Sequence, residues 1–128
     1  MNFLLDTHTF LWLDNPSHLL PERVIAIIKN DDTRLFLSYV SIWEIMIKAG
    51  VGKMELRLPL DELIQEQVVT NRLQLLPIEY SHIFALRHLP QLDHRDPFDR
   101  MLIAQALQEN LIIISRDSQF TKYPVRVI

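Results

Sequence analysis

The sequence predicts an α/β protein: a three-layer α/β/α sandwich around a central, mostly parallel sheet of about five strands. Short apolar runs alternate with longer segments of helical pattern along the 128 residues. The run LIIIS at 111–115 is apolar without alternation, which is typical of a strand buried on both faces. Strands that alternate with helices need crossover connections, and these favour parallel pairing. The length indicates a single domain over residues 1–128.

Each element has its own local signals. The strands are predicted at 2–5, 35–38, 73–78, 111–115 and 125–128, and the helices at 21–30, 40–49, 60–71, 79–89 and 96–109. The helix at 96–109 is marked most clearly, because Asp96 is a good N-cap and Pro97 suits the first turn. Segment 50–58 is either a loop or a small protruding arm.

Composition excludes several classes of protein. The chain has no cysteine, so disulfides, thiol nucleophiles and zinc ribbons are absent. Its two glycines, Gly50 and Gly52, cannot form a phosphate-binding loop, a dinucleotide-binding fingerprint or a hydrolase elbow. A net charge of −3 does not suit nucleic-acid binding through bulk charge. The first residues lack the basic region of a signal peptide, and we expect a cytoplasmic protein.

Four carboxylates fall where parallel sheets bind their ligands, beyond the carboxyl ends of the strands. Asp6 and Asp117 follow the first and fourth strands, Glu44 lies one turn into the helix after the second strand, and Asp99 lies in the first turn of the helix at 96–109. Each also has a purely structural interpretation. Asp6 could cap a short helix at 8–13, Asp117 could form a turn, Glu44 could pair with Lys48, and Asp99 could favour a helix N-terminus.

The helical wheels favour a cleft for two of these acids. Apolar side chains surround the helix at 40–49 almost completely, and Ser41, Glu44 and Lys48 share one narrow polar stripe. A helix of this kind is expected to have little solvent face, so the stripe should line a cleft. Asp99 projects in line with an apolar stripe, where a carboxylate is costly unless it is paired or bound to a metal.

Converging carboxylates repel one another, and a divalent cation removes that conflict. Oxygen ligands alone indicate Mg²⁺ or Mn²⁺ rather than Zn²⁺. The histidines at 8, 18, 82, 88 and 94 show no metal-binding spacing, and we interpret each as a surface or packing residue. Trp12 and Trp43 are expected in the core.

Four motifs, in order, resemble the PIN domain, the nuclease fold of bacterial VapC-type toxins. They are FLLDTHTFLW at 3–12, S-x-x-S-x-W-E-I at 38–45, HRDPFDRMLIAQA at 94–106 and I-I-S-R-D-x-x-F at 113–120. The third is the most specific. The family's acids are carried over to Asp6, Glu44, Asp99 and Asp117, with Asp96 as a capping companion.

The resemblance implies a Mg²⁺- or Mn²⁺-dependent endoribonuclease that cleaves RNA phosphodiester bonds with metal-activated water. It also implies the toxin of a toxin–antitoxin pair, a homodimer and a cognate antitoxin as partner. Thr7 and Ser115 are candidate donors that orient the carboxylates. The candidates for substrate contact are Lys48, Arg95, Arg100 and Arg116.

Three alternatives remain open on the sequence alone. The chain could be a PIN-fold binding protein with little or no catalysis, a Mg²⁺-binding receiver-like signalling module, or a nuclease that acts on DNA. The apolar faces of 21–29 and 50–58 are candidate contact surfaces for a second subunit or an antitoxin helix.

Overall fold

The computed structural model describes residues 1–14 and 19–128, so His18 lies outside the described residues. The strands are β1 (Asn2–Leu5), β2 (Arg34–Ser38), β3 (Gln74–Leu76) and β4 (Ile112–Ile114). The helices are α1 (Thr7–Asp14), α2 (Glu22–Lys29), α3 (Tyr39–Gly50), α4 (Leu60–Asn71), α5 (Tyr80–Ala85) and α6 (Pro97–Glu109). Short 3₁₀ helices, η2 (Leu86–His88) and η3 (Ser118–Lys122), follow α5 and β4.

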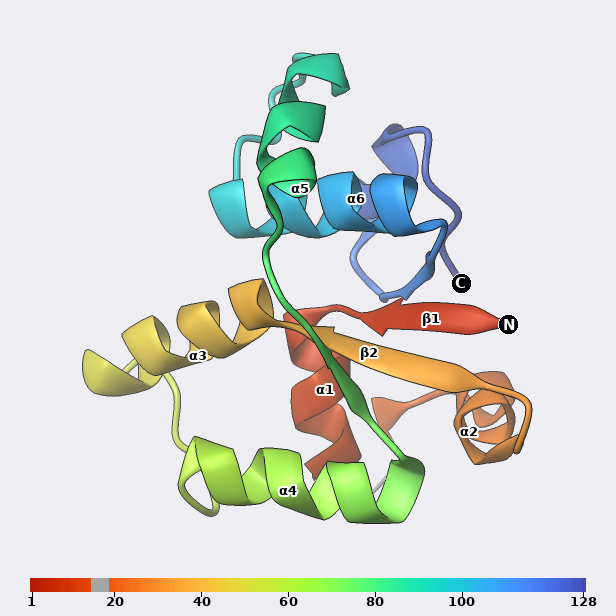
Figure 1. Cartoon of the computed structure of the whole chain (residues 1–128). Coiled ribbons are helices and arrows are strands. Elements are labelled where there is room, and N and C mark those ends of the chain that lie inside the picture. The colour runs from red at the N-terminus through yellow and green to blue at the C-terminus, as the bar shows by residue number, and fades with distance from the viewer. Residues whose placement is uncertain (15–18) are drawn as a thin grey trace.

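The four strands form one parallel sheet in the order β3-β2-β1-β4. The strand formed first along the chain therefore lies in the middle, between β2 and the last strand, β4 (Figure 1). Because all four strands run the same way, their carboxyl ends meet at one edge of the sheet. That edge carries the residues that follow β1, β2 and β4.

Side chains alternate between the two faces of the sheet, and each face is covered by helices. Phe3 and Leu5 of β1 join one buried cluster with Phe10 of α1 and Leu63 of α4. Leu4 joins the other cluster, which includes the buried side of α6. Figure 1 shows α5 and α6 on one side of the sheet, and α1, α2 and α4 on the other. These layers confirm the predicted α/β/α arrangement.

The expected fifth strand is wrong. Segment 125–128 runs beside β4 and exchanges backbone hydrogen bonds with it, since Ile113 N donates to Arg126 O and Ile128 N donates to Ile113 O. Only one residue pair, Ile113 with Val127, forms a parallel bridge, and a single pair does not make a ladder. The third strand is also shorter than expected, because Pro77 has no N–H with which to continue the pairing.

Side chains cap the two helices that carry Glu44 and Asp99, and the cap at Asp96 was expected from the sequence. Ser38 caps α3 by accepting a hydrogen bond from Val40 N, and Asp96 caps α6 by accepting one from Asp99 N. The region at 79–89 divides into α5 and η2 rather than one continuous helix. None of the helices in the ranges that the structure covers has both the length and the hydropathy to cross a bilayer.

Segment 50–58 is a loop that lies against the protein rather than a protruding arm. Met54, Leu56 and Leu58 pack against the cluster beneath α4, and so do Ile25 and Ile27 of α2. The two segments expected to offer apolar contact surfaces therefore use most of these side chains within the fold.

Candidate functional site

Asp6 lies at the centre of the carboxyl edge, between the ends of β1 and β4. Its Oδ2 accepts a hydrogen bond of 2.5 Å from Ser115 Oγ, and its Oδ1 accepts one of 2.8 Å from Thr9 N. The second bond caps α1, so the expectation that Asp6 could cap a short helix is confirmed. Ser115 Oγ also accepts from Asp117 N, which links Asp6 to the start of η3. Asp6 is buried with its carboxylate fixed at both oxygens.

Glu44 approaches the same edge from α3. Thr7 Oγ1 donates to Glu44 Oε1 over 2.6 Å, and Ser41 Oγ lies 3.0 Å from the same Thr7 oxygen. Lys48 Nζ forms an ion pair of 2.5 Å with Glu44 Oε2. This hydrogen bond is the main reason that the pKa of Lys48 is raised above its usual value. The polar stripe of α3 therefore faces inward, and Glu44 and Ser41 are buried.

Asp99 approaches from α6 and contacts a histidine that follows no metal-binding pattern. His94 Nε2 lies 2.9 Å from Asp99 Oδ2, and His94 Nδ1 lies 3.1 Å from the Tyr123 hydroxyl. Arg100 donates to the same hydroxyl over 3.0 Å and to Pro90 O over 3.1 Å. The His94 ring is thus fixed on both sides, and it fixes the Asp99 carboxylate in turn.

The pKa of Asp99 reflects its buried position and the other acids near it. Burial raises the pKa of Asp99 from 3.8 to about 6, against the lowering effect of the His94 hydrogen bond. The nearby charges of Asp96 and Glu44 contribute to this rise. Carboxylates from α3 and α6 therefore act on one another across the edge of the sheet.

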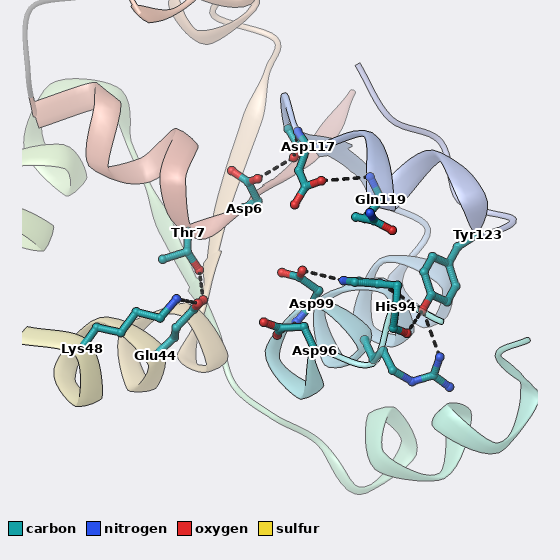
Figure 2. Close-up of polar contacts among 12 residues, drawn as sticks. Asp6, Thr7, Glu44, Lys48, His94, Asp96, Asp99, Asp117, Gln119 and Tyr123 are labelled. Carbon is teal, nitrogen blue, oxygen red and sulfur yellow. Dashed lines mark hydrogen bonds and ion pairs between the residues drawn. The ribbon is translucent and has the colours of Figure 1, made fainter. Parts of the chain in front are cut away.

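The acids surround one space. In Figure 2, Asp6, Asp96, Asp99 and Asp117 lie around a common space, and Glu44 lies beside it below Thr7. Asp117 also caps η3 by accepting a hydrogen bond from Gln119 N over 2.9 Å. Within residues 1–14 and 19–128, no three Asp, Glu or His side chains are already close enough together to hold a metal ion. The carboxylates share an edge of the sheet but remain engaged by their own donors.

The four cations considered for substrate contact differ in their surroundings. Lys48 is the one whose pKa responds to the acids Glu44, Asp96 and Asp99. Arg95 is exposed in the loop before α6. Arg100 is engaged by Tyr123 and Pro90, and Arg116 donates to Leu19 O and stacks over Trp12.

Two expectations about α3 and the histidines need correction. The outer side of α3 is exposed and apolar, with Trp43 58%, Met46 58% and Ile47 43% accessible, and Trp43 rests edge-on against Phe98. The helical wheel gave the direction of these side chains but not whether a neighbouring element covers them. His94 is more than a packing residue, because it contacts Asp99. Its position just before the capped helix start, five residues from Asp99, is the signal that could have identified it.

The chain matches a known protein family over most of its length. A family model described as the PIN domain matches residues 3–125. The chain belongs to the PIN domain family. No curated protein sequence matches the chain closely enough to be counted as a relative.

Solved structures with this PIN fold include toxin–antitoxin complexes, which resemble the chain over its whole length. VapBC2 from Rickettsia felis bound to a promoter DNA fragment has a TM-score of 0.72 at 15% identity, covering 100% of this chain and 98% of that one. DNA-bound VapBC from Salmonella typhimurium has a TM-score of 0.66 at 17% identity, with 100% and 97% covered. FitAcB from Neisseria gonorrhoeae has a TM-score of 0.58 at 20% identity, with 100% and 96% covered.

Membership in the PIN family also decides between the fold alternatives. A receiver-like module has the strand order 2-1-3-4-5. The order β3-β2-β1-β4 differs from it. The receiver-like alternative is therefore wrong.

Proposed function

We propose that this PIN domain is a Mg²⁺- or Mn²⁺-dependent endoribonuclease, with Asp6, Glu44, Asp99 and Asp117 as ligands of the metal. The observation that carries the proposal is the placement of Asp6, Asp99 and Asp117 around one space, with Glu44 beside it (Figure 2). The pKa of Asp99 is raised by burial and by the charges of Asp96 and Glu44, which agrees with this placement. A site with uncompensated negative charge and oxygen ligands alone suits a hard divalent cation. The bound cation would supply Lewis-acid chemistry, activating water and offsetting charge on a phosphodiester.

Hydrogen-bond donors of the chain orient these proposed ligands. Ser115 and Thr9 hold the two oxygens of Asp6, Thr7 holds Glu44, and His94 holds Asp99. Such donors restrict the rotation of a carboxylate and make it a better-defined ligand. Lys48 occupies Glu44 Oε2, so direct binding through that oxygen requires Lys48 to move. Once released, Lys48 is a cation at the edge of the site that can contact a phosphate.

The decisive experiment is cleavage of a single-stranded RNA by the purified protein with Mn²⁺, with Mg²⁺ and with EDTA. Asp6→Asn removes the charge but keeps a side chain that caps α1 well. We expect this variant to lose more than about 100-fold in rate, since loss of a ligand should exceed the 10–100-fold typical of residues that orient one. Asp31→Asn, at a fully exposed carboxylate, is the matched control and should retain the wild-type rate.

The ends of the products test the chemistry. Attack by water leaves a 5′-phosphate and a 3′-hydroxyl and does not need the ribose 2′-hydroxyl. Cyclic 2′,3′-phosphate ends would contradict this route. Cleavage of single-stranded DNA at the same rate would show that the chain is a nuclease that also acts on DNA. Absence of any metal-dependent cleavage would favour the alternative of a PIN-fold binding protein.

We further propose that the chain is the toxin of a toxin–antitoxin pair that acts in the cytoplasm. The support is its likeness to VapBC2 from Rickettsia felis and to a toxin–antitoxin complex from Klebsiella pneumoniae. The exposed apolar side chains of α3, and Tyr80, Ile83 and Phe84 of α5, are surfaces of the kind that a partner or a second copy covers. Toxicity on induced expression should disappear with Asp6→Ala and with co-expression of the neighbouring antitoxin gene. Light scattering of the purified chain would establish the expected homodimer.

A further inference from the structure

A fully buried amide, Gln105, connects the two helices that carry Glu44 and Asp99. Gln105 lies on α6 with no exposed surface. Its Oε1 accepts a hydrogen bond of 2.5 Å from Ser38 Oγ, at the end of β2. The same Ser38 oxygen accepts from Val40 N and caps α3. A single hydroxyl thus joins the start of α3 to the middle of α6.

The other end of the amide is also engaged. Gln105 Nε2 donates to Pro77 O over 3.2 Å and lies 3.3 Å from His82 Nδ1. That nitrogen accepts from Glu79 N, so His82 Nε2 is the ring donor to Glu109, at 3.0 Å. Two acceptors therefore face Nε2 and one donor faces Oε1. This arrangement fixes the orientation of the amide, and none of the buried polar side-chain atoms in the described ranges lacks a partner.

The connection is placed symmetrically with respect to the acids. Glu44 lies six residues after Ser38 on α3, and Asp99 lies six residues before Gln105 on α6. At about 1.5 Å per residue, each acid is about 9 Å along its helix from the Ser38–Gln105 hydrogen bond. Apolar packing alone lets helices slide slightly, whereas hydrogen bonds to a buried amide have a narrow range of distance and angle. The bond therefore sets how α3 and α6 are placed relative to each other.

We propose that Gln105 is a positioning residue for the acid centre: through Ser38, it fixes the separation of Glu44 and Asp99 and thereby the affinity of the site for a divalent cation. The inference rests on the proposed metal-dependent function. Gln105 lies within the motif at 94–106 and Ser38 within the motif at 38–45, and this inference gives both a role beyond that of the acids. Gln105 touches neither substrate nor metal in this account.

The test measures Mn²⁺ binding by isothermal titration calorimetry, together with thermal stability. Gln105→Met keeps the length of the side chain but removes its three hydrogen bonds, to Ser38, Pro77 and His82. We expect its Mn²⁺ dissociation constant to rise about 10-fold or more, in the range seen when residues that orient ligands are removed. The control is Leu111→Ala, just after the end of α6. This variant removes buried apolar volume from the hydrophobic cluster that packs against α6, and it removes no side-chain hydrogen bond. It should lower the melting temperature and change the dissociation constant less than about twofold.

Ser38→Ala tests the same connection from the other helix and provides the decisive measurement if Gln105→Met fails to fold. We expect Ser38→Ala to weaken Mn²⁺ binding, and the double variant to be no weaker than the weaker of the two single variants, because both remove one connection. Losses that multiply in the double variant would overturn the inference. An unchanged affinity in Gln105→Met or Ser38→Ala would also overturn it.

The outcomes separate the two proposals. If the wild type binds Mn²⁺ and Asp99→Asn weakens that binding, but Gln105→Met behaves like Leu111→Ala, only the positioning role is wrong. If the wild type shows no Mn²⁺ binding, the proposed function fails and this inference fails with it.

Discussion

Two polar regions involve side chains of α6, and they differ in how their charges are balanced. In the connection formed by Ser38, Gln105, His82 and Glu109, every donor meets an acceptor. In the acid centre, Asp99 lies near Asp96 and Glu44, and burial raises its pKa to about 6. The first region is complete as it stands, whereas the second carries more negative charge than its donors offset. This difference indicates which region supports the fold and which is prepared for a ligand.

The largest expected effect comes from breaking the balanced region. His82→Ala leaves Glu79 N and Gln105 Nε2 without their shared acceptor and removes a completely buried ring. The buried Gln105 N–H that loses its partner costs about 1–3 kcal/mol, and truncating the buried ring adds the cost of a cavity, so we expect the free energy of unfolding to fall by about 3–4 kcal/mol. Urea denaturation measures this change. His88→Ala, at an exposed histidine on the next turn, should have little effect.

In the acid centre, by contrast, removing the charge of Asp99 should raise the free energy of unfolding at neutral pH. Because the folded-state pKa of Asp99 is raised above 3.8, the folded state holds this proton more tightly, and stability is lost as pH rises from about 4 to about 6. Asp99→Asn cannot ionise, so above pH 6 it should unfold at a higher urea concentration than the metal-free wild type. Below pH 4 the two proteins should agree. If Asp99→Asn is less stable than the wild type at pH 7.5, ionised Asp99 does not destabilise the folded state.

Divalent cations should reverse this ranking. Millimolar Mn²⁺ binds only the folded protein and should raise the melting temperature of the wild type at pH 7. The increment should be smaller for Asp99→Asn, because the variant lacks one charged ligand. An identical increment in both proteins would remove Asp99 from the proposed ligand set.

The smallest expected effect concerns the histidine beside Asp99. His94 lowers the pKa of Asp99 through its hydrogen bond, so His94→Phe should raise that pKa further above its ordinary value. The ionised form then becomes scarcer at pH 7, and we expect Mn²⁺ binding to weaken about 10-fold. Part of the loss should be recovered at pH 8. Titration calorimetry at both pH values measures it, with His8→Phe as a control at an exposed histidine.

The sequence predicts those parts of this design that depend on local signals. Asp96 and Pro97 mark the start of α6, and the carboxyl ends of the strands place Asp6 and Asp117 at one edge. The buried connection could not be predicted in this way, because Gln105 has the appearance of an ordinary helix former. Its partner Ser38 is 67 positions away, and only the packed helices bring the two side chains together.

The exposure of α3 was also beyond local analysis. The periodicity of Trp43, Met46 and Ile47 shows that they share one side of the helix, but burial depends on whether another element covers that side. The prediction of a fifth strand was wrong for a related reason, because strand formation also depends on pairing with a neighbouring element. Segment 125–128 has strand-like composition, yet β4 pairs with it at one residue only.

The place of β1 in the sheet has a consequence for biosynthesis. β1 is synthesised before the other three strands, but β4, one of its two neighbours, is synthesised last of the four. Asp6 receives its hydroxyl donor from Ser115, 109 positions later, so the carboxylate stays incompletely held until that residue has been synthesised. The acid centre is therefore completed only after β4 has taken its place beside β1, late in the folding of the domain.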